Sequence, residues 1–329
     1  MSRVVATALL REQAADPWRC WIRHAPVRWP GPEAPWVDLA AGTLGSSDGE
    51  PEVLAALQGP RLADVLHLPP VPADLAAARD RLAANHTSRG VPVIVQLLAG
   101  DARPAGVAAT AELVVVWDLL PLALAGEGSS AIIAFSSAVR PGDAAVLPLL
   151  PGAVDAQRLD ALAAALADAG ITVLQPLLLE LSGRDRRTLA ESIGESMSET
   201  SYLRFFHGEA PSPLPAARAA ARRGLLPLLP RPLPRPPLLG AGNLRIAGAL
   251  AACGELCLLL GEPESRAQAL LRAARFAERE GRDLAALSRE GNLAVLPWLE
   301  GEALQVAAEV AGGAEARLWT QLLSRLHAT

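Results

Sequence analysis

The sequence predicts an α/β protein of the (β/α)8 TIM-like barrel type, which need not be complete, with a C-terminal helical extension. Short apolar runs alternate with helical segments over residues 36–239, as in folds whose strands are covered by helices. Few polar residues interrupt the runs, which is typical of parallel strands buried on both faces. The runs reach eight, and no G-x-G-x-x-G turn follows the first. A barrel is therefore favoured over the alternative, an open doubly wound parallel sheet.

The individual elements follow from local patterns. The predicted strands are residues 36–41, 63–68, 91–98, 112–119, 131–136, 144–150, 171–179 and 225–229. The helices predicted between them are residues 72–86, 155–170 and 182–195. The second of these helices is the clearest, because Leu159, Leu162 and Leu166 share one face and Gly170 suits a left-handed helix end.

After residue 240 only helical patterns remain, and helices are predicted at residues 243–261, 264–281 and 314–328. The chain is therefore divided into three parts. The predicted parts are an N-terminal covering segment at 1–35, a barrel domain at 36–239 and a helical segment at 240–329 that packs on the barrel.

A proline-rich run at residues 227–237 joins the last two parts. Prolines three residues apart can present one face to a partner's aromatic groove. The flanking segments are strongly apolar, however, and would be costly to expose to water. We therefore predict that the run is a rigid connector between barrel and helices rather than a docking peptide.

Composition excludes several kinds of chemistry. The chain has no lysine, so it can form no lysine Schiff base or pyridoxal-phosphate anchor and has no P-loop lysine. A net charge of -5 and an aromatic content of 4% argue against nucleic acid as a partner. The three cysteines, Cys20, Cys253 and Cys257, are too few for a disulfide framework and indicate a reducing compartment. With no signal peptide or membrane span expected, we predict a cytoplasmic location.

Catalytic groups of a barrel lie where its strands end. Asp118 follows the apolar run "LVVVW", so its carboxylate could act as a general base or a metal ligand. Asp38 and His67 lie in the first two predicted strands and complete the predicted acid/base set. Two of them have a structural alternative: Asp118 could cap the following turn, and His67 could be a packed, hydrogen-bonded side chain.

Ligand-binding positions are predicted at other strand ends. Gln96 and Gln175 interrupt apolar strands, and their amides could orient a polar ligand. Ser137 and Arg140 follow the fifth predicted strand, where the arginine could hold an anion.

A second anion site is predicted after the last strand. Gly240, Gly242 and Arg245 precede a helix there and could bind phosphate at its N-terminus. A flexible turn explains the same glycines.

The sequence contains no strong metal or cofactor motif, so the cofactor is left unassigned and no metal ligand is predicted. Cys253 and Cys257 lie four apart in a predicted helix, and no third cysteine stands at a spacing that would complete a cluster. Both are interpreted as buried core residues.

Two functions are compatible with these observations. The first is a barrel enzyme that acts on a small, anionic metabolite by acid/base or metal-assisted chemistry at the carboxyl ends of its strands. The second is a non-catalytic barrel that serves as a subunit or scaffold, forms a homo-oligomer or docks a partner protein through its helical extension. Convergence of the polar strand-end residues would favour the enzyme.

Overall fold

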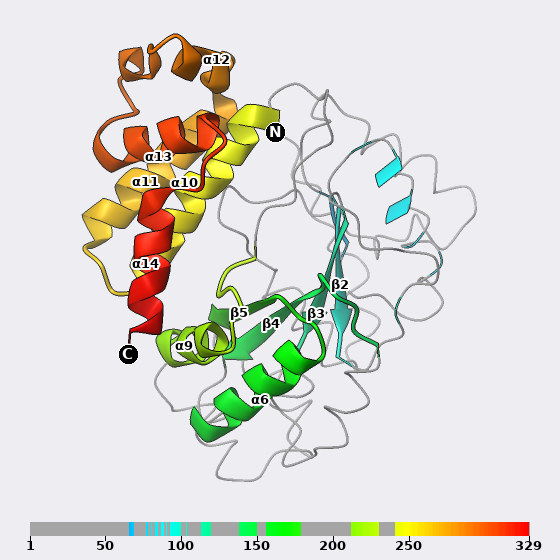
Figure 1. Ribbon diagram of the computed structural model, residues 1–329. Helices are drawn as coiled ribbons and strands as arrows, with labels where there is room; N and C mark the ends of the chain where they lie inside the picture. Colours follow the sequence, from blue (N-terminus) through cyan, green and yellow to red (C-terminus); the bar gives the residue numbers. More distant parts are fainter. Residues whose placement is uncertain are drawn as a thin grey trace, which may run out of the picture.

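The computed structural model shows an α/β fold with a parallel sheet, followed by a helical unit (Figure 1). The structure describes residues 66–68, 93–99, 113–119, 138–149, 156–178, 212–229 and 241–328, together with single positions at 77, 80, 83, 84, 87, 88, 90 and 103. The predicted covering segment, the predicted strands at 36–41 and 131–136, the helix at 182–195 and the proline run beyond residue 229 lie outside these residues.

Five parallel strands form the sheet, and their spatial order is their order in the chain. They are β1 (Leu66–Leu68), β2 (Val93–Leu98), β3 (Leu113–Asp118), β4 (Ala144–Leu149) and β5 (Val173–Leu178). Each lies inside a predicted apolar run, so these predictions are confirmed. Leu226, in the last predicted run, forms a further parallel bridge with Val173.

The sheet corrects the predicted strand order at one place. β3 and β4 pair directly, with Val116 opposite Ala144 and Asp118 opposite Val146. A barrel built from the eight predicted strands in sequence would need the run at 131–136 between them. Because β3 is hydrogen-bonded directly to β4, no strand lies between them. The prediction of eight consecutive strands is therefore wrong at this place.

Two helices, α6 (Ala156–Asp168) and α9 (Leu214–Arg222), cover one face of the sheet (Figure 1). In α6 the predicted leucine face is buried, and Gly170 adopts a φ of 89°, as its place after the helix requires. The sequence analysis did not predict α9. Its Ala216, Ala219 and Ala220 pack on the sheet, while alanines on its other side join the core of the helical unit, so α9 connects the two cores.

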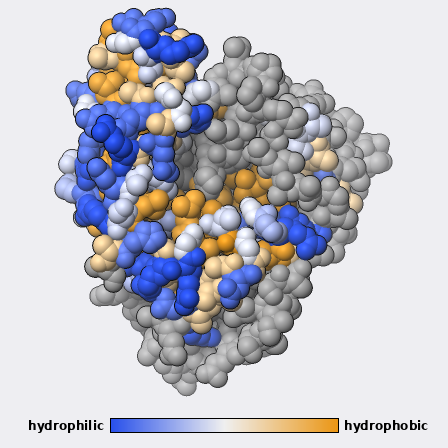
Figure 2. Space-filling model, viewed as in Figure 1, coloured by the Kyte–Doolittle hydropathy of each residue, from blue (hydrophilic) through white to orange (hydrophobic). Residues whose placement is uncertain are grey.

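Strand alternation gives the sheet two different faces. Val95, Val115, Trp117 and Leu147 point toward α6 and α9 and form the larger core. The opposite face, which we call the polar face, carries the buried residues Ile94, Gln96, Val116, Asp118, Val146, Val173 and Gln175. In the space-filling view, apolar residues gather over the strands, whereas the visible surface of the helical unit is mostly hydrophilic (Figure 2).

The helical unit consists of α10 (Ala241–Leu259), α11 (Glu264–Arg279), α12 (Leu284–Arg289), the 3-10 helix η3 (Leu293–Val295), α13 (Gly301–Ala311) and α14 (Arg317–His327). The three helices predicted in this part of the chain are confirmed as α10, α11 and α14. The short helix α12 and the helix α13 were not predicted.

α10 is the central helix of this unit. It packs against α11, α13 and α14, and Ile246, Leu250, Cys253 and Cys257 are buried in the shared core. At Gly254 the helices approach so closely that a Cβ would lie 2.8 Å from the Leu271 side chain. The glycine thus permits the contact between α10 and α11.

The stretch Gly242–Leu259 of α10 is long and apolar enough to cross a membrane, alone among the helices that the structure describes. The sequence analysis expected no apolar segment of that length. More than half of the stretch, 56%, is buried inside the protein, as in the central helix of a folded bundle. The apolar character of this long stretch is thus explained by its packing in the core of the helical unit.

An ion-pair network ties α14 to the rest of the unit. Glu262 pairs with Arg266 and with Arg325 of α14, and Arg266 also pairs with Glu302 of α13. The hydrogen bonds from Arg325 and Arg266 hold the pKa of Glu262 below its usual value. The bond from Arg266 likewise lowers the pKa of Glu302. These side chains therefore stay charged and link three helices.

Candidate functional site

A carboxylate and an amide meet on the polar face where β2 and β3 end. The amide Nε2 of Gln96 donates a hydrogen bond of 2.9 Å to Oδ2 of Asp118. The bond forms because Gln96 is level with Val116 in the parallel register, so Asp118 lies two residues further on the same face. Both side chains have an exposed fraction of 0%. The pair is therefore a polar contact in an apolar, water-poor environment.

Gln175 lies on the same face, two strands away. Val146 of β4 pairs with Asp118 on one side and with Gln175 on the other. Two strand spacings separate the carboxylate from this second amide, roughly 10 Å between backbones. Gln175 is also buried, with 6% of its surface exposed. The polar face thus presents one carboxylate and two amides on a layer of valine and isoleucine side chains.

The amide of Gln96 orients the carboxylate of Asp118. A carboxylate held in position by a neutral donor is one kind of group that general acid/base chemistry uses. Burial makes each polar contact stronger than it would be in water. Such a group at the carboxyl end of a parallel strand is where α/β proteins commonly place catalytic residues.

The structure thus brings together three of the predicted residues: Asp118, Gln96 and Gln175. His67 lies in β1, in register with Ile94 of β2. Asp38, Ser137 and Gly240 lie outside the described residues.

Arg140 lies at a different place. It is exposed in the turn before β4, and its backbone N–H donates to Oδ2 of Asp143 at 2.9 Å. The turn precedes β4, whereas Asp118 stands at the end of β3.

The predicted anion-binding turn after the last strand is already helical. α10 begins at Ala241, so Gly242 and Arg245 belong to its first turns rather than to a loop before it. Nη2 of Arg245 donates to the carbonyl oxygen of Val310 at 3.1 Å, near the end of α13. The arginine therefore helps to hold α13 against α10.

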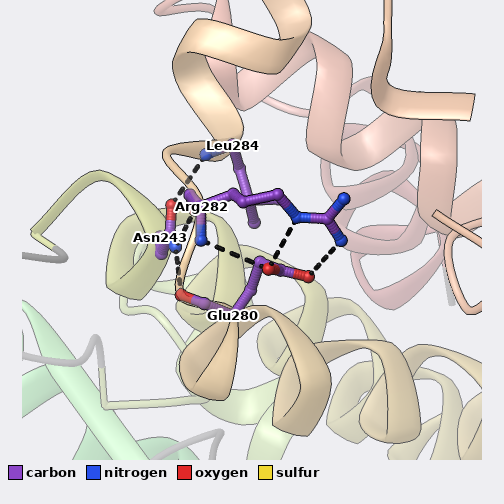
Figure 3. A network of polar contacts seen from close by, with 4 residues as sticks. All are labelled: Asn243, Glu280, Arg282 and Leu284. Atoms are coloured by element: carbon purple, nitrogen blue, oxygen red, sulfur yellow. Dashed lines mark hydrogen bonds and ion pairs between the residues drawn. The ribbon is translucent and has the colours of Figure 1, made fainter. Parts of the chain in front are cut away.

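Asn243, between these two residues, fixes the connection from α11 to α12 (Figure 3). Its Nδ2 donates to the carbonyl oxygens of Glu280 and Arg282, at 2.9 and 2.8 Å. Its Oδ1 accepts from the backbone N–H of Leu284 at 3.0 Å. All three bonds go to backbone groups, so this amide acts as a structural clamp.

Asp143, directly before β4, is a buried carboxylate that the sequence analysis did not single out. Its Oδ2 accepts from Nε1 of Trp117 at 2.9 Å and forms an ion pair with Arg103. Trp117 belongs to the face covered by α6 and α9, so Asp143 lies on the opposite side of the sheet from Asp118. The stretch "RPGD" indicates a turn, and the local bond from the Arg140 N–H fits that turn. The two side-chain partners of Asp143 lie 26 and 40 residues away, so no local signal marks it as a buried carboxylate.

Metal ligands do not gather in the part of the chain that the structure describes, where no group of three or more His, Cys, Asp or Glu side chains could hold an ion. Cys253 and Cys257 are buried and free of disulfides, as interpreted from the sequence. Burial raises the pKa of Cys253 to about 12, and it also raises that of Cys257. Both thiols are therefore protonated and poor nucleophiles at neutral pH.

Comparison of the chain with protein-family models, with curated proteins and with solved structures gives no match.

Proposed function

We propose that this protein is a barrel-type α/β enzyme that acts on a small polar metabolite by acid/base chemistry at Asp118. The observation that carries the proposal is the fully buried Gln96–Asp118 pair at the ends of two neighbouring parallel strands. Removing a carboxylate from water costs free energy, so its burial requires a compensating benefit. Proton transfer to or from a bound substrate supplies such a benefit.

Three features support the barrel architecture in this proposal. The described strands are parallel, and their order in the sheet is their order in the chain, as in a barrel. In a doubly wound sheet the strand order reverses at one point. Leu226 continues the same progression beyond β5. The polar residues stand on the face opposite α6 and α9, which would be the barrel interior.

Each residue has a distinct proposed role. Asp118 is the general base or acid, Gln96 positions its carboxylate, and Gln175 orients polar groups of the substrate. The sequence led us to expect an anionic substrate, bound by Arg140 or by the turn that contains Gly242 and Arg245. Arg245 instead bonds within the helical unit. We therefore propose a polar metabolite without specifying its charge.

The test compares two buried carboxylates on opposite faces of one sheet. Purified wild type, Asp118→Asn and Asp143→Asn would be examined by native mass spectrometry and metal analysis for molecules that co-purify. Thermal unfolding would then be followed with a panel of sugar phosphates, carboxylic acids and amino acids. Asp118→Asn should keep its fold, because the new amide oxygen still accepts from Gln96, and should lose the ligand response.

Asp143→Asn should show the reverse pattern. Breaking its buried pair with Arg103 should lower stability by a few kcal/mol, while the ligand response below its melting temperature remains. If Asp118→Asn retains the full ligand response, or if it unfolds while Asp143→Asn does not, Asp118 has a structural role and the proposal is wrong.

The alternative function, a non-catalytic subunit or scaffold, is favoured by a different observation. Phe276 of α11 is 46% exposed, and Val295 of η3 is 61% exposed. Large apolar side chains at the surface are typical of interaction sites. Wild type that responds to no small molecule but forms a stable assembly would favour this alternative.

A further inference from the structure

We infer that the outer side of α11 is a docking surface for an acidic helical segment of a partner protein. The surface consists of Arg272, Arg275, Phe276 and Arg279 of α11, with Trp298 beside them, and is called the α11 surface below. The four helix residues are spaced i, i+3, i+4 and i+7, so they lie on one side of the helix. All four are exposed. This inference is independent of the catalytic role proposed for Asp118.

The arginines of the α11 surface differ from four other arginines of the helical unit. Arg266, Arg282, Arg317 and Arg325 each pair with a glutamate. The guanidinium groups of the α11 surface take part in no hydrogen bond or ion pair with any residue that the structure describes. Three positive charges without an ion-pair partner among the described residues therefore stand together on a chain whose net charge is -5.

An aromatic pair lies within this positive surface. The rings of Phe276 and Trp298 stack with centroids 5.7 Å apart and an interplanar angle of 26°. The stacking holds Phe276 in place although nearly half of it is exposed. Aromatic and arginine side chains together are the composition most enriched at the energetic centres of protein interfaces.

Charge and dimensions indicate the partner. Arg272 and Arg279 are seven residues apart, about 10 Å along the helix. A partner helix with Asp or Glu at matching spacing around one Leu or Phe would pair with the arginines and cover Phe276. Nucleic acid fits less well, because its affinity depends on many phosphate contacts, and the net negative charge of the chain would oppose it.

The test uses a defined probe. A fluorescein-labelled helical peptide carries one Leu flanked by Glu residues three and four positions away on each side. A second peptide has Gln in place of every Glu. Fluorescence anisotropy would measure binding of both to wild type, R272E/R279E and Phe276→Ala. The matched control is R223E/R289E, which makes the same charge change at exposed arginines after α9 and in α12.

Wild type should bind the Glu peptide in a salt-dependent manner and the Gln peptide at least about tenfold more weakly. R272E/R279E and Phe276→Ala should each weaken binding about tenfold or more. R223E/R289E should bind like wild type. R272E/R279E should stay folded with a melting temperature only slightly below that of wild type, because the replaced side chains pair with no residue that the structure describes and only Arg279 lies in the last turn of α11, where a positive charge is favourable. The inference is overturned if the Glu peptide does not bind, if R223E/R289E loses as much affinity, or if a single-stranded oligonucleotide binds more tightly through the same residues.

Discussion

Asn243 offers the sharpest prediction about stability, because one side chain holds three backbone groups (Figure 3). Replacing it with Ala removes all three hydrogen bonds. Each contributes roughly 1 kcal/mol net, and the N–H of Leu284, which is bonded in the interior, costs about 1–3 kcal/mol when left without a partner. Two bonds to carbonyl groups and the unpaired N–H together should lower the free energy of unfolding of Asn243→Ala by about 3–5 kcal/mol.

Asn243→Asp separates the donor from the acceptor function. The new carboxyl keeps the oxygen that accepts from Leu284, but at neutral pH it places a second oxygen against the carbonyls of Glu280 and Arg282. Its destabilisation at neutral pH should equal or exceed that of Asn243→Ala. The carbonyls favour the protonated form, so the carboxyl pKa should be raised in the folded state. The deficit should then shrink as the pH falls and the carboxyl regains a proton that it can donate.

Urea unfolding followed by far-UV circular dichroism would measure both effects, with the midpoint compared at neutral and acidic pH. The control is Gly242→Ala, at the neighbouring position of α10, where a Cβ meets nothing within 4 Å. That variant should be unchanged or more stable by up to about 1 kcal/mol. Stability of Asn243→Ala within about 0.5 kcal/mol of wild type, or an Asn243→Asp deficit that grows as the pH falls, would refute the reasoning.

Two further predictions concern the core of the helical unit. Gly254→Ala should lower the unfolding free energy by about 1–3 kcal/mol in the same urea assay, because the new Cβ would meet Leu271 at 2.8 Å; a gain, as at an exposed helix glycine, would show that α10 and α11 can separate. In a Cys20→Ser background no thiol should react with a thiol reagent such as Ellman's reagent in the native protein near neutral pH, since Cys253 and Cys257 are buried with raised pKa values. Both should react in denaturant, and fast native labelling would contradict the buried assignment.

The sequence anticipated those elements whose signals are local. The apolar runs at 91–98 and 112–119 became β2 and β3 because strands buried on both faces need such composition. The helix at 155–170 was predicted from its leucine spacing and Gly170, which is a periodicity of a single segment.

Elements without such signals were missed. α9 is built mainly from alanine and arginine, and its Pro213 and Pro215 are easily taken for a loop. Alanine is buried there only because the sheet and the helical unit approach α9 from two sides. That is a property of the assembled fold, which the segment itself does not encode.

The candidate site shows the same division. Asp118, Gln96 and Gln175 were identified because polar residues in apolar strands stand out in the sequence. That the first two are bonded depends on the register of β2 against β3, which local pattern does not specify. Asp143 and Asn243 were not identified, since the side chains that bond to Asp143 and the backbone groups that bond to Asn243 lie 26 to 41 residues away.

By itself, the sequence of this protein determined the segments of the five described strands and of the helices α6, α10, α11 and α14, and which chemistries are excluded by the lack of lysine. Only the tertiary structure decided that β3 lies beside β4, that Asp118 and Asp143 face opposite sides of the sheet, and that Arg245 bonds to Val310. The physical reason is range. Hydrophobic periodicity and turn preference act within a few residues, whereas hydrogen bonds and ion pairs join residues that become neighbours only after the chain has folded.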